Sequence, residues 1–137
     1  MRCGATNFAN INYMEGELIH KELSYTLNGV LFAVQNKLGT KFQEKHYVKA
    51  VCIMLKELEI AYQTEVPLLV KFSGEVLGNF RADLVVDNKI LIEFKAVDYL
   101  TSDHRMQLLR YLQSLNLRLA LLVNFRMRPL QVRRVVN

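Results

Sequence analysis

The sequence has few cysteines and no long apolar run. These two shortages argue against a disulfide-stabilised protein and against a membrane protein. Its 137 residues include two cysteines, Cys3 and Cys52, which are too few for a disulfide framework and lack the spacing of a metal site. No apolar run approaches the roughly 18 residues of a membrane span. The start, MRCGATNFANINYMEGE, holds no apolar core of signal-peptide length. We therefore expect a soluble, cytoplasmic protein with no membrane segment.

Acidic residues are absent from the last quarter of the chain. From His104 to Asn137 there is no aspartate or glutamate, and the basic residues there are seven arginines. The preceding part, Met1 to Asp103, holds 11 basic and 13 acidic residues, a balance of −2. A long segment of one charge sign indicates a polyanionic partner, and arginine used without lysine favours phosphate. A solvated basic face that only aids solubility explains the charge alone equally well.

The composition predicts a single folded domain. About half of the residues are hydrophobic and 23% are charged, which is ordinary for a globular chain, and 137 residues suit one core. Neither an internal repeat nor a low-complexity linker is present. We expect a loose leader over residues 1–16 and one domain over residues 17–137.

Two helices are expected first. Between Leu18 and Leu38 the apolar residues recur at helical spacing, and Gly39 is a stop signal. A second helix is expected from about Phe42 to Leu58, with an inner face of Val48, Val51, Cys52 and Leu55, so Cys52 reads as a buried structural thiol.

Strands and one more helix complete the predicted order. Alternating patterns predict three antiparallel strands, in the first of which Pro67 indicates an edge or an irregular position. A helix capped by Thr101 or Ser102 and two further strands follow. The expected ranges are strands 61–72, 76–86 and 90–96, helix 102–115, and strands 117–124 and 131–136. This order predicts an α/β fold with a mixed sheet covered by helices.

The strand 90–96 carries two charged residues on one face. Side chains alternate between faces, so Ile90, Ile92, Phe94 and Ala96 form an apolar face, and Leu91, Glu93 and Lys95 share the other. A solvent-exposed strand face would explain Glu93 and Lys95 by themselves.

Asp83 changes that interpretation. If the turn holds Asp87, Asn88 and Lys89, Asp83 lies opposite Glu93; a two-residue turn would pair it with Ile92 instead. We choose the first register. Two close carboxylates repel, and a hard cation such as Mg²⁺ gives a fold a reason to tolerate them. Lys95 beside them could orient or deprotonate water and stabilise developing charge on phosphorus.

Three further residues are candidates. Glu44 lies in the first turn of the second helix, on the face of Val48, where it could serve the site or only stabilise the helix dipole. Gln107 and Tyr111 are one turn apart on the later helix. They could contact a phosphate or a ligand carboxylate, or form an ordinary buried hydrogen-bonded pair.

These residues resemble known families. Asp83 followed after nine residues by Glu93-Phe94-Lys95 resembles the signature of the PD-(D/E)XK nuclease superfamily, with Ala82 in place of the proline. Gln107 through Tyr111 resembles the Q-x-x-x-Y motif of its exonuclease branch. The run from Leu38-Gly39 to Glu44-Lys45-His46-Tyr47 resembles the GxxExxY protein family, as do Leu122-Val123-Asn124-Phe125 and Arg133-Arg134-Val135. Lys41 stands where that family has its glycine.

The resemblance implies a fold, a cofactor and a site. The fold is a restriction-endonuclease-like core, a central mixed sheet flanked by helices. The cofactor is Mg²⁺ or Mn²⁺, with Asp83, Glu93, Glu44 and the Phe94 carbonyl as ligands. Lys95 is then the catalytic lysine, and Gln107, Tyr111 and Tyr47 support the site.

The implied activity is hydrolysis of phosphodiester bonds in DNA, or in RNA, by metal-activated water. We assign the nucleic-acid contacts to Arg105, Arg110, Arg126 and Arg128, and we expect a homodimer or a larger protein partner because the chain is small. A non-catalytic nucleic-acid-binding or regulatory module on the same fold is the alternative, and a toxin–antitoxin-like partner protein with a vestigial site is another.

Overall fold

The computed structural model describes residues 13–14 and 17–137. Most of the expected leader, residues 1–16, lies outside the described residues, so this division of the chain stays a prediction. Two short strands that the sequence did not predict, β1 (Tyr13–Met14) and β2 (Glu17–Leu18), pair antiparallel.

Both predicted N-terminal helices are present. α1 spans Lys21–Leu38 and ends at Gly39, whose φ of 81° suits glycine. α2 spans Glu44–Glu57, and the N–H of Gln43 at its start donates to His46 Nδ1. The inner face of α2 differs from the prediction at one position, because Tyr47 is fully buried and Val48 is only half-buried.

The predicted strands form a five-stranded sheet. Its order is β3-β4-β5-β6-β7, in which β5 and β6 run parallel and the other neighbours run antiparallel. The bounds are β3 Tyr62–Phe72, β4 Glu75–Val86, β5 Ile90–Lys95, β6 Leu119–Asn124 and β7 Gln131–Val136. β3 is an edge strand, which confirms the inference from Pro67. The mixed sheet flanked by helices confirms the predicted fold class.

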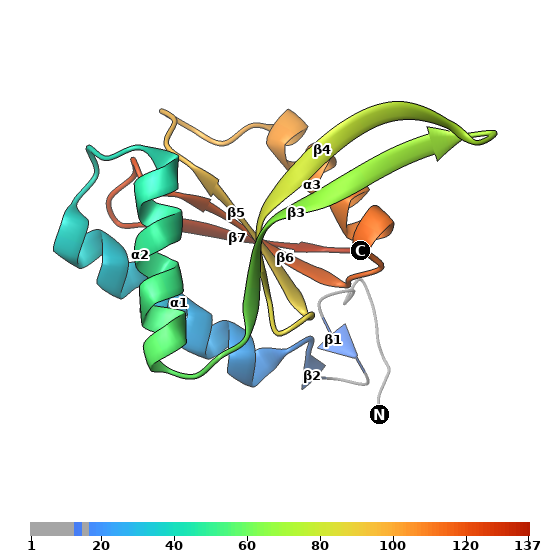
Figure 1. Cartoon of the computed structure of the whole chain (residues 1–137). Helices are drawn as coiled ribbons and strands as arrows, with labels where there is room; N and C mark the ends of the chain where they lie inside the picture. The colour runs from blue at the N-terminus through green and yellow to red at the C-terminus, as the bar shows by residue number, and fades with distance from the viewer. Residues whose placement is uncertain (1–12, 15–16) are drawn as a thin grey trace.

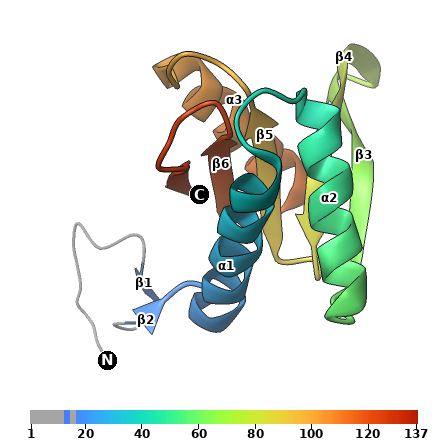
Figure 2. The same cartoon turned by 90° about the vertical axis from the view of Figure 1, so that its left-hand side faces the viewer.

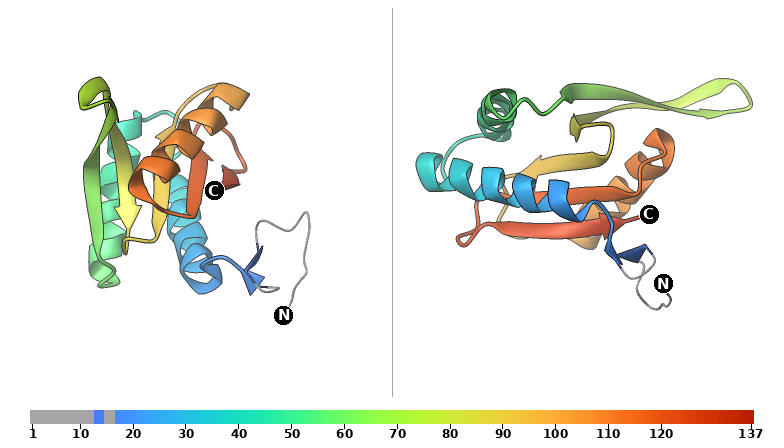
Figure 3. Two further views of the ribbon diagram at one scale, coloured as in Figure 1. Left: turned by 90° about the vertical axis from the view of Figure 1, so that its right-hand side faces the viewer. Right: turned by 90° about the horizontal axis from the view of Figure 1, so that it is seen from below.

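Helices cover the sheet on both sides, as Figure 2 shows. α1 and α2 pack on the face that carries Leu84 and Ile92, whereas α3 (Ser102–Leu115), capped by Thr101, packs on the face that carries Val85 and Leu91. The outer half of the β3–β4 hairpin extends beyond the other strands (Figures 1 and 3). None of the described helices is both long and apolar enough to cross a membrane.

Two buried amides fasten the chain at the end of the sheet where β5 and β6 finish. Asn124 donates to the Val97 carbonyl at 2.9 Å, and its Oδ1 accepts from the N–H groups of Val97 and Arg126. Gln35 of α1 donates to the carbonyls of Phe125 and Met127. The segments that follow Lys95 and Asn124 are therefore held in place beside each other.

Candidate functional site

The site begins where β4 and β5 stop pairing. Their ladder joins Val86 to Ile90, Val85 to Leu91 and Leu84 to Ile92, which is the register that a turn of Asp87, Asn88 and Lys89 gives. The next residue on each strand is an acid.

At that point each acid binds the other strand's backbone. Asp83 Oδ2 accepts from the Phe94 N–H at 2.9 Å, and Glu93 Oε1 accepts from the Asp83 N–H at 3.4 Å. The sequence therefore predicted that the two acids lie side by side. It did not predict that their side chains accept the backbone N–H groups of the opposite strand, because an alternating pattern assigns side chains to faces only.

Burial acts on both carboxyls, and neighbouring acids add to its effect. Glu93 is only 7% exposed, and its burial, followed by the charge of Asp83, raises the pKa of Glu93 to about 8. Burial also raises the pKa of Asp83, and the Glu44 charge adds to this, although the Phe94 N–H and Lys95 oppose it. Such raised values are typical of like charges in a partly dry site.

Glu44 reaches the same place from α2. Its Oε2 accepts from the Ala96 N–H at 3.2 Å, and its charge contributes to the raised pKa values of Asp83 and Glu93. Lys95 ends β5, and its positive charge lowers the pKa of both acids. The structure thus brings together the three acids and the lysine that the sequence singled out.

The other predicted supporting residues lie at different places. Tyr111 of α3 is near the acids, since burial and then the charges of Glu93 and Asp83 raise the pKa of Tyr111. Gln107 is half-buried one turn earlier on the same helix. Tyr47 stacks on Phe125 at 4.2 Å, and its hydroxyl donates to the Gly39 carbonyl and accepts from the Phe42 N–H. Tyr47 therefore holds the loop that precedes Glu44.

The predicted nucleic-acid-binding arginines are exposed and divided between two elements. Arg105 and Arg110 lie on α3, whereas Arg126 and Arg128 lie in the loop between β6 and β7. Arg126 forms an ion pair with Asp98 at 3.7 Å on the surface. Another arginine of the basic segment has a structural contact, since Arg134 donates to Ser24 and to the Ile19 carbonyl. The segment is therefore not one uniform face.

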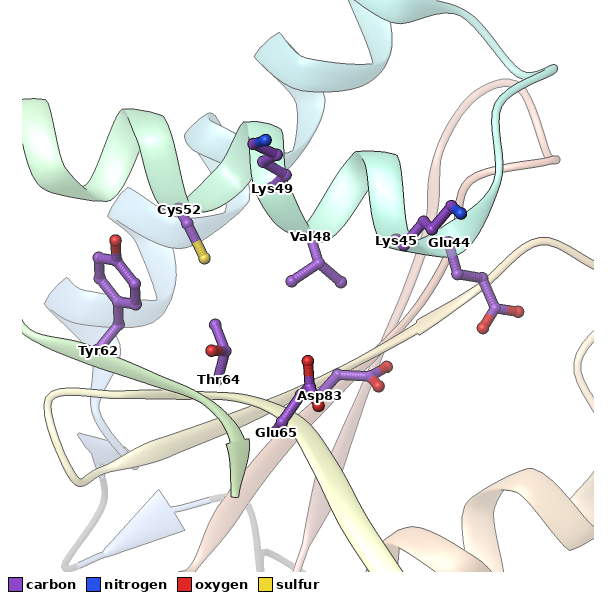
Figure 4. Close-up of a pocket in the computed structure, with 9 residues that line it drawn as sticks. All are labelled: Glu44, Lys45, Val48, Lys49, Cys52, Tyr62, Thr64, Glu65 and Asp83. Atoms are coloured by element: carbon purple, nitrogen blue, oxygen red, sulfur yellow. The ribbon is translucent and has the colours of Figure 1, made fainter. Parts of the chain in front are cut away.

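A cleft of about 550 Å³ adjoins the acids, between α2 and the β3–β4 pair (Figure 4). Asp83, Glu44 and Glu65 line it together with Lys45 and Lys49 of α2. Sequence reasoning missed both lysines because it sought basic charge in the C-terminal segment. Their spacing of four residues, with Lys45 directly after Glu44, was the available signal.

The donors suit a hard cation better than a soft one. Carboxylate oxygens from Asp83, Glu93 and Glu44 and the Phe94 carbonyl are the ligand type that Mg²⁺ and Mn²⁺ take, whereas zinc favours histidine and cysteine. Within residues 13–14 and 17–137, no three His, Cys, Asp or Glu side chains form a closed metal cluster. The arrangement fits a cation held by one or two carboxylates, with water and a substrate phosphate completing its shell.

Comparisons with known proteins concern the family and the fold of the chain. The family model described as the PD-(D/E)XK nuclease superfamily matches residues 21–135. Among solved structures, the crystal structure of SSO0001 is similar, with a TM-score of 0.50 and 16% identity over 81% of this chain. The chain spans 65% of the length of SSO0001, and at that identity the likeness concerns the fold alone. No curated protein matches the chain.

Proposed function

Because the chain belongs to the PD-(D/E)XK nuclease superfamily, we propose that it is a nuclease that uses Mg²⁺ or Mn²⁺ to hydrolyse phosphodiester bonds in DNA. The observation that carries the proposal is the pair of acids, half-buried Asp83 and buried Glu93, at the point where two strands separate beside Lys95. Ionising two acids this close together is unfavourable in the fold, and a bound divalent cation offsets that unfavourable charge.

Each residue has a role in this chemistry. Asp83, Glu93 and the Phe94 carbonyl bind the cation, and Glu44 is its ligand from α2. The bound cation supplies Lewis-acid charge and acidifies a coordinated water. Lys95 orients that water or deprotonates it and stabilises the charge that develops on the phosphorus oxygens.

Gln107 and Tyr111 support the acids from α3, and Tyr47 holds the loop that precedes Glu44. Within the superfamily we place the chain in the GxxExxY family, and the support is Glu44 in the first turn of α2 with Tyr47 three residues later. Arg105, Arg110, Arg126 and Arg128 contact the nucleic-acid backbone in this proposal.

Cleavage assays test the proposal. Labelled single- and double-stranded DNA, and RNA, are incubated with the protein and Mg²⁺, Mn²⁺ or EDTA. We expect products with either metal and none with EDTA, and we expect Glu93→Gln and Lys95→Ala to lower the rate at least 100-fold. Glu57→Gln and Lys56→Ala at the exposed end of α2 are matched controls and should cut normally.

Two results would overturn the assignment. Unchanged cleavage in both site variants would show that the activity arises elsewhere or from a contaminant. Binding of DNA without cleavage under any metal condition would favour the non-catalytic module on the same fold.

A further inference from the structure

The two ends of the cleft between α2 and β3 differ in chemistry. The acids Asp83, Glu44 and Glu65 lie at one end. Farther along α2 the lining changes to Val48 and Cys52. On β3, Tyr62 lies opposite Cys52, and Thr64 lies between Tyr62 and the acids, as Figure 4 shows. An apolar and aromatic wall next to a metal-binding group suits a ligand with a flat ring and a phosphate.

The basic residues of the cleft come from one side of α2. Lys45 and Lys49 are exposed and one turn apart. The ion pairs found among the described residues are Lys89–Asp87 and Arg126–Asp98, so neither lysine is neutralised by a described carboxylate. The Glu65 carboxylate on the opposite wall repels phosphate, which leaves the α2 side as the place for a backbone phosphate.

The size of the cleft also constrains the ligand. A volume of about 550 Å³ lies within the range of small-molecule sites. A base that enters such a space cannot stay paired and stacked in a duplex, because its ring must leave the stack to reach the wall.

We propose that this cleft binds one unpaired nucleotide next to the bond that is cut, and that the substrate is therefore single-stranded or carries an unpaired end. The base stacks on Tyr62 and packs against Val48 and Cys52. Lys45 and Lys49 bind the phosphate that follows it. This proposal rests on the proposed nuclease function and specifies its substrate.

Binding without cleavage tests the proposal. Fluorescence anisotropy in EDTA compares an oligo-dT with an abasic oligonucleotide of the same length and charge. Stacking on an aromatic ring changes affinity by roughly 5- to 150-fold per base, so we expect wild-type protein to prefer oligo-dT at least about fivefold.

Variants separate the base from the phosphate. Tyr62→Leu keeps an apolar side chain against the core and should reduce the preference toward one, whereas Tyr62→Phe should retain it. Lys49→Ala should weaken binding of both oligonucleotides by the same factor. The matched controls are Tyr25→Leu, at an exposed position of α1, and Lys56→Ala on α2. They should change neither the preference for oligo-dT nor the affinity. Melting temperatures check that each variant is folded.

The outcomes distinguish this proposal from the function on which it rests. Equal affinity for the two oligonucleotides, or a preference that survives Tyr62→Leu in a folded protein, would overturn the nucleotide pocket even if the protein cuts DNA. A preference that depends on Tyr62 in a protein that cuts nothing with Mg²⁺ or Mn²⁺ would support the pocket and refute the nuclease.

Discussion

At the scale of single residues, the exchange between Asp83 and Glu93 is the feature with the clearest physical consequence. Each carboxylate accepts a backbone N–H from the opposite strand, so the acids hold the separated strand ends together. Burial also makes ionisation of both acids unfavourable, and the charge of Asp83 adds to this at Glu93. The site is therefore held together by groups whose ionisation costs stability until a cation binds.

Metal-free stability should fall as pH rises through the range set by Glu93. The pKa of Glu93 is about 8 in the fold against 4.5 for the free side chain. The folded state therefore keeps a proton that the unfolded chain releases, and stability is lost as pH rises from about 4.5 to 8. In EDTA, Glu93→Gln removes this loss. The free energy of unfolding of the variant minus that of wild type should therefore increase by about 2 kcal/mol or more from pH 5 to pH 9.

Urea denaturation at a series of pH values measures this difference. Asp87→Asn, at an exposed turn position with φ of 53° that asparagine tolerates, is the control and should track wild type. A constant difference between wild type and Glu93→Gln across the pH range would contradict the raised pKa.

At the scale of elements, the sequence predicted most of what the structure contains. Apolar spacing identified α1 and α2, and Gly39 identified the end of α1. α3 was expected after Thr101 or Ser102, and Thr101 is its cap. The choice of a three-residue turn from Asp87 to Lys89 gave the register of β4 and β5, in which Val85 lies opposite Leu91, although a period of two did not by itself exclude a two-residue turn.

Long-range partners could not be predicted in this way. Asn124 looks like an ordinary polar strand end. Besides a local bond from the Arg126 N–H, it forms two hydrogen bonds with Val97, which appear only when the segment after Lys95 folds back to it. The cleft lysines depend likewise on how α2 lies across β3. A period of apolar residues places side chains on faces but does not say which distant segment they meet.

Replacing Asn124 tests whether its hydrogen bonds hold these segments in place. Asn124→Ala leaves the N–H and C=O of Val97 and the N–H of Arg126 without their partner, so we expect a loss of about 2–3 kcal/mol in unfolding free energy. Cleavage should fall as well, because the segment after Lys95 is no longer held. Chemical denaturation measures the loss of unfolding free energy. The control is Asn79→Ala, at an exposed position of β4, whose unfolding free energy should stay within about 0.5 kcal/mol of wild type. A loss no larger than this control's would contradict the role of Asn124.

At the scale of the whole molecule, the net charge of +5 has a less simple meaning than the C-terminal segment alone indicated. The exposed arginines divide between α3 and the β6–β7 loop, Arg134 has structural contacts, and lysines of α2 line the cleft. The basic residues that line the cleft beside the acids are therefore those of α2, whereas the four assigned arginines lie on two other elements. A homodimer or larger partner stays a prediction.

The salt dependence of binding tests the assigned arginines. The logarithm of the affinity for single-stranded DNA in EDTA should fall linearly with the logarithm of the salt concentration. Each contacted phosphate should contribute about 0.7 to the steepness of that line. The combined substitution of Arg105, Arg110, Arg126 and Arg128 by alanine should reduce that slope, by up to about 3 if each contacts one phosphate. Lys71→Ala on the extended hairpin should leave it unchanged. An unaltered slope in the fourfold variant would show that other residues contact the phosphates of the nucleic acid.

Direct measurement of metal binding tests the central claim most closely. Electron paramagnetic resonance of Mn²⁺ titrated into the protein at pH 8 counts bound ions without requiring a substrate. We predict a saturable site in wild-type protein that is weakened at least tenfold in Asp83→Asn and in Glu93→Gln but not in Asp87→Asn. Equal Mn²⁺ binding by wild type, Asp83→Asn and Glu93→Gln would show that these two acids do not hold a cation.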